Sequence, residues 1–219
     1  MLNIAIDGPA GAGKSTIAKA VSKKLGIVYL DTGAMYRGAA YAALKRGLDV
    51  NDASQIEPFL SGLEMSIECG DVQQIIVNGE NVTPFIREHK ISKAASDISK
   101  LPAVRLKLVE LQREIAGRTA CVLDGRDIGS YVLPDAEYKF FVTASPEERA
   151  NRRFKELREK GSDLTYEEIL ADIKDRDYND SHRAFAPLVQ VADARLIDTT
   201  ALTVDEAVGA VLRIIEGEK

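Results

Sequence analysis

The stretch at residues 8–16, "GPAGAGKST", directly follows the short apolar run "LNIAID" at residues 2–7. Its first eight residues match the pattern GxxxxGK(S/T), in which glycines let backbone N–H groups turn inward around the phosphates of a nucleotide. The apolar run suits a buried parallel strand, and residues 13–25 have the spacing of a helix that stops at a glycine. In this context Lys14 can reach the β- and γ-phosphates of a nucleoside triphosphate, and the Ser15 hydroxyl can be a ligand for Mg²⁺. The stretch therefore predicts a phosphate-binding loop that opens an α/β fold.

The composition is that of an ordinary globular protein, with 219 residues of which 45% are hydrophobic and 29% charged. There are 29 Lys and Arg against 34 Asp and Glu, a formal charge of −5, so we expect no nucleic-acid partner, which would favour a basic surplus. No apolar run approaches the roughly 18 residues that cross a bilayer, and we expect a cytoplasmic protein with no membrane contact. Cys69 and Cys121 form no CxxC pair and are expected to be reduced packing residues.

Short apolar runs alternate with helical segments along most of the chain. This alternation predicts a doubly wound parallel sheet with helices on both faces. The helix starts at Ser145, Thr165 and Thr203 each have a glutamate three residues later, as in a capping box. Besides the run at residues 2–7, the predicted strands are residues 27–30, 119–124, 138–144 and 194–200.

Two segments interrupt the alternation. Residues 63–82 contain β-branched runs separated by "GD" and "NGEN", which predicts a small antiparallel β insert. Residues 149–183 are densely charged and helical, with few apolar positions for a core and a glycine, Gly161, near the middle. We interpret this second segment as a helical hairpin that closes over the active site as a lid.

The residues after the third predicted strand help to separate the classes of protein that use such a loop. A GTPase needs an NKxD segment, which is absent, and an ATPase motor usually has a glutamate that activates water. Here "CVLD" is followed by Gly125, Arg126 and Asp127. An arginine in this place favours holding a second anion, bidentately, over activating water. A kinase of a small acceptor is therefore favoured. A nucleotide, shikimate and dephospho-coenzyme A are all candidate acceptors at this point, and an ATP-gated switch is the alternative class of protein.

Arginines of the charged segment support the same reading. Arg176, Asp180 and Arg183 fall at i, i+4 and i+7, on one predicted helix face, and Arg152 and Arg153 lie on the other helix. Such a run can be a solvated helix surface, but a transferring phosphoryl group needs arginines close to it.

The stretch "DTGAMYR" after the second predicted strand adds Thr32, Tyr36 and Arg37 at the edge of the sheet where ligands bind in open α/β folds. Thr32 is also a candidate helix cap, and Tyr36 fits core packing as well as a binding site.

At this point the sequence resembles the bacterial cytidylate kinases, a group within the nucleoside monophosphate kinase family. The resemblance implies one domain, residues 1–219, with a core (1–36, 103–148, 184–219), a monophosphate-binding insert (37–102) and a lid (149–183). It is carried, in the order of the family, by "IDGPAGAGKST", "LDTGAMYR", "PFIRE", "LPAVR", "LDGRDIG", "ERANRR" and "IKDRDYNDSHRAFAPL".

The resemblance implies transfer of phosphate from ATP, with Mg²⁺, to CMP or dCMP by a monomeric enzyme. It implies catalytic roles for Lys14, Arg126, Arg153 and Arg176, with Arg152 in the lid and Ser15 at the metal. The implied ATP-binding residues are Gly8, Pro9, Ala10, Gly11, Ala12, Gly13, Lys14, Ser15 and Thr16. The implied CMP-binding residues are Thr32, Tyr36, Arg37, Ser96, Arg105, Arg126, Asp127, Arg176, Asp180 and Arg183.

The base-reading residues implied by the family make chemical sense. A carboxylate such as Asp127 can accept from the N4 amine of cytosine, and Arg105 and Ser96 can donate to N3 and O2. Uracil reverses the polarity at two of these atoms and would leave buried groups unpaired, at a cost on the order of 1–3 kcal/mol each. His182, where a more basic residue is common in the family, and His89 are expected to be partly solvated helix residues.

Overall fold

The computed structural model describes residues 1–68, 73–159 and 161–217, and its internal contacts divide the chain into two units. Met1 and Val28–Ala120 form the first unit, and Leu2–Ile27 with Cys121–Lys219 form the second, which we call the core unit. The three-part division into core, insert and lid stays a prediction.

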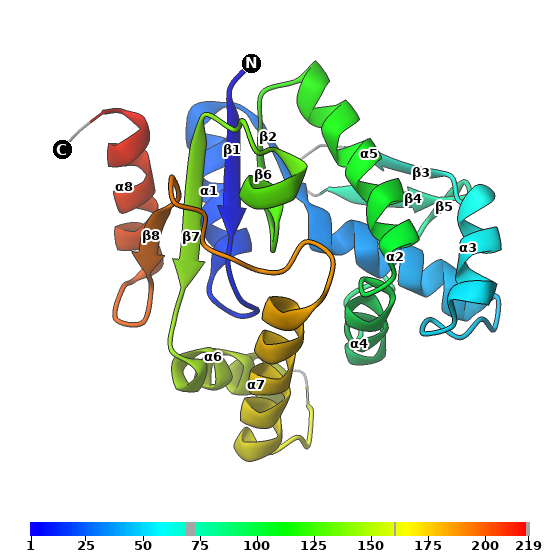
Figure 1. Ribbon diagram of the computed structural model, residues 1–219. Helices are drawn as coiled ribbons and strands as arrows, with labels where there is room; N and C mark the ends of the chain where they lie inside the picture. Colours follow the sequence, from blue (N-terminus) through cyan, green and yellow to red (C-terminus); the bar gives the residue numbers. More distant parts are fainter. Residues whose placement is uncertain (69–72, 160, 218–219) are drawn as a thin grey trace. The chain divides into compact units, whose positions relative to one another are not determined.

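The core unit contains parallel strands in the order β6-β1-β7-β8. These strands are β1 (Asn3–Asp7), β6 (Cys121–Gly125), β7 (Tyr138–Thr143) and β8 (Arg195–Asp198). Figure 1 shows them running the same way, so their carboxyl ends share one edge. β1 and β6 are adjacent strands, and both are almost fully buried, which is why both have continuous apolar sequences. The α/β class with a parallel sheet is confirmed.

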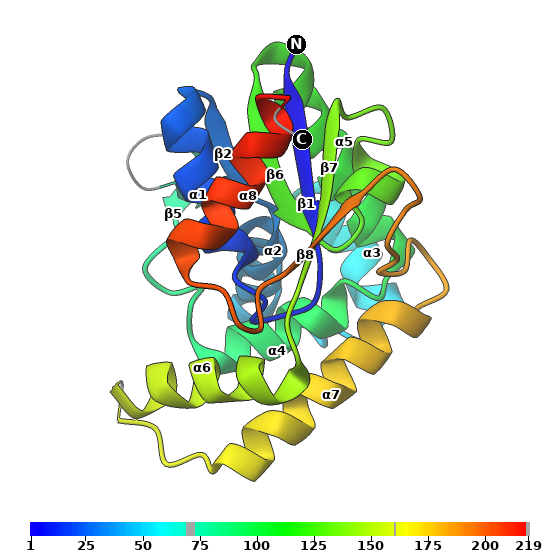
Figure 2. The same ribbon diagram turned by 90° about the vertical axis from the view of Figure 1, so that its left-hand side faces the viewer.

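Two helices of the core unit, α1 (Lys14–Leu25) and α8 (Val204–Ile215), contact each other, and Figure 2 shows them side by side. α1 ends at Gly26, which adopts the left-handed conformation as the glycine stop predicted. α8 begins at the predicted capping box of Thr203 and Glu206.

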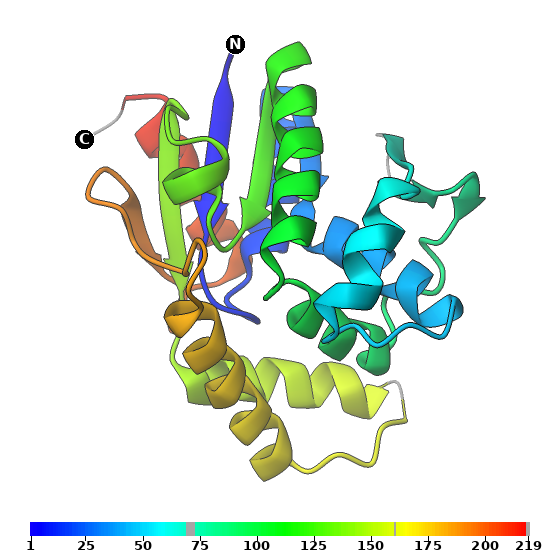
Figure 3. The ribbon, with the colours of Figure 1, turned by 45° about the vertical axis from the view of Figure 1, so that its right-hand side comes forward.

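The helical hairpin of the core unit consists of α6 (Pro146–Glu159) and α7 (Tyr166–His182), drawn in yellow-green and gold in Figure 3. α7 has the predicted capping box of Thr165 and Glu168. At α6, Glu148 N–H donates to the Ser145 hydroxyl at 3.2 Å, which is one of the two hydrogen bonds of the predicted box. The hairpin has an apolar core of its own, contrary to the expectation from its charge, because widely spaced apolar side chains converge once the two helices pair. This core consists of Ala150, Ile169 and Ile173 with Phe154, Leu157, Leu164, Tyr166 and Leu170 packed against it.

A second difference concerns the end of this hairpin. α7 ends at His182, and Arg183 is the C-cap with an extended ψ of 143°. The predicted helix face of Arg176, Asp180 and Arg183 is therefore wrong for its last member. A short π-helix, η1 (Ile128–Val132), follows β6 and was not predicted.

The first unit begins with β2 (Val28–Asp31) and contains the predicted antiparallel insert, a sheet of order β3-β4-β5. Its helix α2 contacts α4, α5 and β4. The other elements of the unit are α2 (Thr32–Lys45), α3 (Ala53–Ser61), β3 (Met65–Glu68), β4 (Gln74–Val77), β5 (Glu80–Asn81), α4 (His89–Ile98) and α5 (Pro102–Arg118).

Cys121 is a buried free cysteine, as predicted, and Cys69 lies outside the described residues. Among the helices that the structure describes, none is long and apolar enough to cross a membrane.

Candidate active site

The phosphate-binding loop connects β1 to α1 in a backbone conformation that requires glycine. Gly8 has φ +147°, and a Cβ there would lie 1.9 Å from the carbonyl oxygen of Val142. Gly11 and Gly13 also have positive φ values, +77° and +88°. Because side chains are excluded, backbone N–H groups and the N-terminus of α1 are available to an anion. The loop geometry predicted from the glycine pattern is present.

Lys14 is buried, 6% exposed, and its Nζ donates to the carbonyl of Pro9 at 2.7 Å. Burial and the positive charge of Arg126 are the main causes that lower the pKa of Lys14 to about 7, although Asp124 opposes them. An ammonium group held near neutrality in this way gains much from a polyphosphate beside it. Lys14 is thus suited to an anionic ligand at the loop.

The Ser15 hydroxyl donates to Asp124 Oδ2 at 2.7 Å. Asp124 is the last but one residue of β6, only 4% exposed, and it was not among the predicted site residues. A hydroxyl next to a carboxylate is a donor set that suits Mg²⁺, which prefers oxygen ligands and retains waters. Within the described residues there is no cluster of three or more metal-ligating side chains. The acid at the end of an apolar strand was a signal that could have indicated Asp124.

Arg126 lies immediately after β6, and its Nε donates to Asp180 Oδ2 of α7 at 2.7 Å. Burial disfavours the charges of both groups, but the guanidinium of Arg126, with Arg176, lowers the pKa of Asp180. The carboxylate of Asp180 in turn raises the pKa of Arg126. The structure thus brings three predicted site residues together in the core unit.

A second buried pair joins Arg183 to Asp127, with Nη2 and Oδ1 3.3 Å apart and side chains 8% and 6% exposed. Arg183 Nε also donates to the carbonyl of Ala186 at 2.7 Å. Asp127 was expected to accept from a base amine, and in this structure its carboxylate faces a guanidinium.

The two lid arginines on α6 differ in their surroundings. Arg152 donates to the carbonyl of Thr199 at 2.7 Å, and its guanidinium lies 3.9 Å from the position of a Cβ on Gly13. Arg153 forms a half-exposed ion pair with Glu156. Arg152 therefore lies beside the phosphate-binding loop.

A third arginine of α6, Arg149, was missed by the sequence analysis and is only 3% exposed. It donates to the carbonyl of Ala10 in the phosphate-binding loop at 3.1 Å and to that of Ala144 at 2.9 Å. Its guanidinium also forms a bidentate pair with Asp177 of α7. Arg149 thus joins the loop to both helices of the hairpin, and no feature of the sequence separates it from the other arginines there.

In the first unit, Asp31 is the N-cap of α2, accepting from Ala34 N–H at 2.8 Å, and it forms an ion pair with Arg37 at 2.9 Å. Thr32, which was a candidate cap, is instead the first residue of the helix and is 3% exposed. The carboxylate of Asp31 is a better cap than the Thr32 hydroxyl, because one of its oxygens accepts from Ala34 N–H while the other pairs with Arg37.

Arg105 on α5 is 1% exposed, and its guanidinium lies over the ring of Tyr36 at 5.5 Å. It donates to the carbonyl of Ser99 at 3.3 Å. Arginine is seldom so fully buried without a specific role, and stacking on Tyr36 keeps its planar group in one orientation. Ser96, half-buried on α4, is the remaining predicted residue of this unit.

The predicted histidines are peripheral. His182 is exposed and stacks on Tyr178, with ring centroids 4.1 Å apart. His89 is the first residue of α4 and is also exposed. This matches the expectation that both are solvated helix residues.

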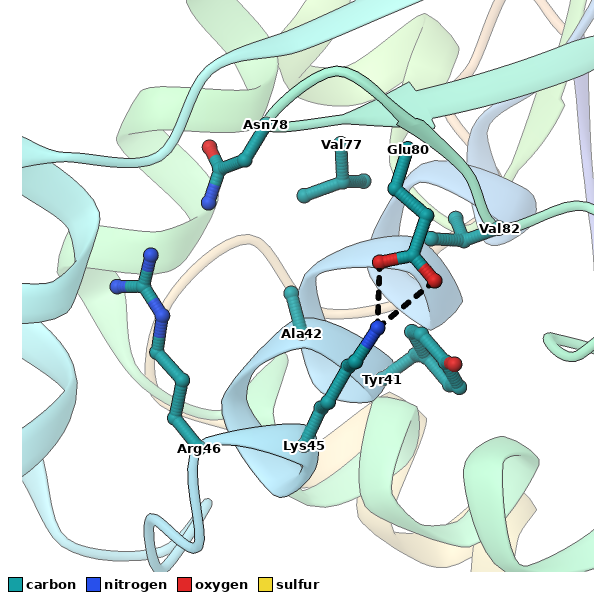
Figure 4. Close-up of a pocket in the computed structure, with 8 residues that line it drawn as sticks. All are labelled: Tyr41, Ala42, Lys45, Arg46, Val77, Asn78, Glu80 and Val82. Carbon is teal, nitrogen blue, oxygen red and sulfur yellow. Dashed lines mark hydrogen bonds and ion pairs between the residues drawn. The ribbon is translucent and has the colours of Figure 1, made fainter.

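Figure 4 shows a cavity of about 320 Å³ in the first unit, beside α2 and the turn between β4 and β5. The ion pair of Lys45 with Glu80 spans it. None of the predicted site residues lines this cavity, so it is separate from the candidate site.

The glycine loop, its buried lysine and the Ser15–Asp124 pair define a nucleotide-binding protein of the P-loop kinase class. A family model described as "Cytidylate kinase" matches residues 4–217, and the chain belongs to this family. Curated cytidylate kinases of Caldicellulosiruptor bescii and Clostridioides difficile are 47% and 50% identical to it, with 97% and 96% of this chain and 95% and 96% of theirs covered.

Solved structures of lower similarity share the fold alone. The crystal structure of an uncharacterized protein from Eubacterium ventriosum has a TM-score of 0.55 and 13% identity, with 99% of each chain covered. That of TT1252 from Thermus thermophilus has a TM-score of 0.50 and 19% identity, with 99% of this chain and 97% of the other covered.

Proposed function

We propose that this protein transfers the γ-phosphoryl group of ATP to CMP and dCMP, giving ADP and the cytidine diphosphates. The observation that carries the proposal is the family match over residues 4–217, which covers the loop, the insert and the hairpin together. The partly buried arginines after β6 and α7 support it, because a kinase of a nucleotide needs a second anion site besides the triphosphate loop.

At the donor side, we assign the triphosphate to residues 8–16. Without a ligand, Nζ of Lys14 donates to the carbonyl of Pro9 in its own loop. When ATP binds, this ammonium group turns to the β- and γ-phosphates. Ser15 with Asp124 would hold Mg²⁺, which supplies positive charge to the phosphates when bound. This charge and the N-terminus of α1 neutralise the donor without any proton transfer.

At the acceptor side, we assign the phosphate of CMP to Arg126 and Arg183 of the core unit and to Thr32 and Arg37 of the first unit. Both core arginines are already desolvated and paired with carboxylates. The phosphate of CMP competes with these carboxylates for the two arginines. We expect it to displace them, because its several oxygens can accept bidentately from each guanidinium. The ion pairs keep the arginines ordered until the acceptor arrives.

The remaining assignments concern the sugar and the base. Asp180 and Arg176 bind the ribose, and Ser96, Arg105 and Asp127 read the cytosine. The stacking of Arg105 on Tyr36 orients the guanidinium for this task. Asp127 is released from Arg183 when the latter turns to the phosphate, and its carboxylate then accepts from the N4 amine.

The reaction itself needs little from the protein besides position and charge. The attacking oxygen belongs to a phosphate anion, so no general base is required; its bond to the γ-phosphorus forms as the bond to the β-phosphate oxygen breaks. Lys14, Arg126, Arg153 and Arg176 stabilise the negative charge that spreads over the transferring group. The monomeric state and the cytoplasmic location stay predictions.

A screen of acceptors tests the proposal directly. ADP release is measured with CMP, dCMP, UMP, AMP, dTMP and shikimate, and we expect CMP and dCMP to exceed the others. A preference for shikimate or another nucleotide would replace the acceptor, and slow ADP formation unaffected by every acceptor would favour an ATP-gated switch.

Arginine variants test the acceptor side. Arg126→Ala or Arg183→Ala is expected to lower kcat/KM for CMP by about tenfold to a hundredfold, since each removes a charge-assisted contact worth ~1.5–3 kcal/mol. The affinity for ATP should change far less. Arg118→Ala, which removes an exposed ion pair with Glu114, is the matched control. Equal losses for both nucleotides would contradict the assignment.

A further inference from the structure

Asp7, the last residue of β1, uses both oxygens of its carboxylate on the backbone of a distant segment. Oδ1 accepts from Ile128 N–H and Oδ2 from Gly129 N–H, each at 2.7 Å, and the residue is only 5% exposed. Burial raises the pKa of Asp7 to about 6 against the opposing effect of these two donors, so the carboxylate is ionised at pH 7.5. Two short contacts to a buried carboxylate are strong hydrogen bonds.

The two N–H groups belong to the start of η1, directly after the base-reading candidate Asp127. Asp127 is the N-cap of this π-helix, with φ −146° and ψ 26°, and its carbonyl accepts from Tyr131 and Val132 N–H at 2.9 and 3.0 Å. The side chain of Asp127 makes no hydrogen bond that caps the helix. Asp7 therefore supplies the acceptors for the first two N–H groups of η1, and the Asp127 carboxylate, which does not cap the helix, faces Arg183 instead.

Gly129 packs closely against Lys139 and Asp7. A Cβ at this position would lie 3.2 Å from Cδ of Lys139 and 3.4 Å from Oδ2 of Asp7. The segment is thus held between β1 and the stem of Lys139, and its backbone has little freedom to shift.

We propose that Asp7 is a positioning residue for the acceptor nucleotide: by holding the backbone that follows Asp127, it directs the Asp127 carboxylate toward the base. The proposal rests on the assignment of Asp127 made above. Asp7 does not contact the substrate; it lies on the strand that carries the phosphate-binding loop, and it acts through η1. Without it, two buried N–H groups lose their acceptor and the segment relaxes.

Asp124 offers a matched comparison, because it is also a buried aspartate near the carboxyl end of a neighbouring strand. Its carboxylate accepts from the Ser15 hydroxyl and therefore serves the ATP side. If the two acids have separate tasks, Asp7→Asn and Asp124→Asn affect different substrates.

Asp7→Asn keeps the shape of the side chain but places an NH₂ group against one of the two N–H donors. We expect KM for CMP to rise about tenfold, KM for ATP to change less than about twofold, and the ratio of kcat/KM for CMP to that for UMP to fall. Asp124→Asn should instead raise KM for ATP and the Mg²⁺ concentration needed for half-maximal activity. It should leave the ratio of kcat/KM for CMP to that for UMP unchanged.

Gly129→Ala tests the same contact from the other side, should Asp7→Asn fold poorly. Its new methyl group would lie 3.2 Å from Cδ of Lys139 and in contact with Oδ2 of Asp7, so either the Lys139 stem or the segment must shift by a few tenths of an ångström. We expect the same pattern of changes as in Asp7→Asn, but smaller. Folding is checked for each variant by circular dichroism and thermal unfolding. A folded variant with a lower Tm but unchanged KM for CMP and unchanged base preference would overturn the proposal, as would equal changes for ATP and CMP; failure of the wild-type protein to phosphorylate CMP would instead overturn the proposed function.

Discussion

Buried ionisable residues gather where β1 and β6 end, and each has a defined partner. Lys14 donates to Pro9, Asp124 accepts from Ser15, and Asp7 accepts from η1. Removing a charge from water is costly unless hydrogen bonds or opposite charges replace the lost hydration. Lys14 has a neutral partner, and the positive charges of Arg126 and Arg176 oppose its ionisation, so an anion at the loop would stabilise the charged lysine.

Lys14 leads to a prediction about protons. Since its pKa is about 7 without a ligand and a polyphosphate raises it, ATP binding at pH 8 should take up close to one proton. Calorimetric titrations with ATP in Tris and in HEPES, whose ionisation enthalpies differ, measure this uptake. A Lys14→Met variant should lack it, and equal binding enthalpies in the two buffers for the wild type would contradict the prediction.

Asp7 leads to a prediction about stability. Its folded pKa of about 6 lies above the ordinary value of 3.8, so the folded protein binds the proton more tightly. The stabilisation that follows is complete below about pH 4 and is lost as the pH rises through 6. Relative to Asp7→Asn, the wild type should therefore gain up to about 3 kcal/mol between pH 7 and pH 4, measured by urea unfolding. A constant difference across this range would contradict the raised pKa.

At the scale of elements, the helical hairpin depends on Arg149 as well as on its apolar core. The bidentate ion pair of Arg149 with Asp177 joins α6 to α7. The hydrogen bond from the Arg149 guanidinium to the carbonyl of Ala10 joins the hairpin to the phosphate-binding loop. This hairpin is the segment predicted to be a lid, and we expect its link to the loop to make it respond to a bound nucleotide.

Breaking this pair should loosen the hairpin. We expect Arg149→Ala to destabilise the protein by about 3 kcal/mol, because it leaves buried carbonyls and a carboxylate without their donor, and Asp177→Asn to cost less. Hydrogen exchange of α7 amides should accelerate in both variants. Lys174→Ala, which removes an exposed ion pair with Glu147, is the control; exchange as slow in Arg149→Ala as in this control would count against the role of Arg149.

At the scale of the whole molecule, substrate binding and folding are linked, because a ligand that binds only the folded state stabilises it. At a CMP concentration of 100 times Kd this amounts to about 2.7 kcal/mol, or roughly 5–10 °C in Tm for a chain of this size. The shift should be smaller with UMP. Arg183→Ala should reduce the shift by CMP at the same concentration to about half or less and keep the shift by ATP. Equal loss of both shifts would contradict separate sites.

Much of this protein could be predicted locally. Strands, helices and the phosphate-binding loop followed from apolar periodicity, glycines and caps, because these signals act between residues a few positions apart. The predictions failed where local signals compete: Asp31 and not Thr32 caps α2, and the residue after α7 is extended. The π-helix η1 was not predicted.

The triphosphate loop, the α/β class and the family could be predicted from the sequence, since each depends on a contiguous stretch or on the order of several stretches. The pairing of the buried charges became clear only from the three-dimensional arrangement. Asp7 binds a backbone 121 positions away, Ser15 an acid 109 positions away, and Arg149 an acid 28 positions away. Such pairs are set by strand order and helix packing, which bring distant residues together and leave no trace in the spacing of their neighbours.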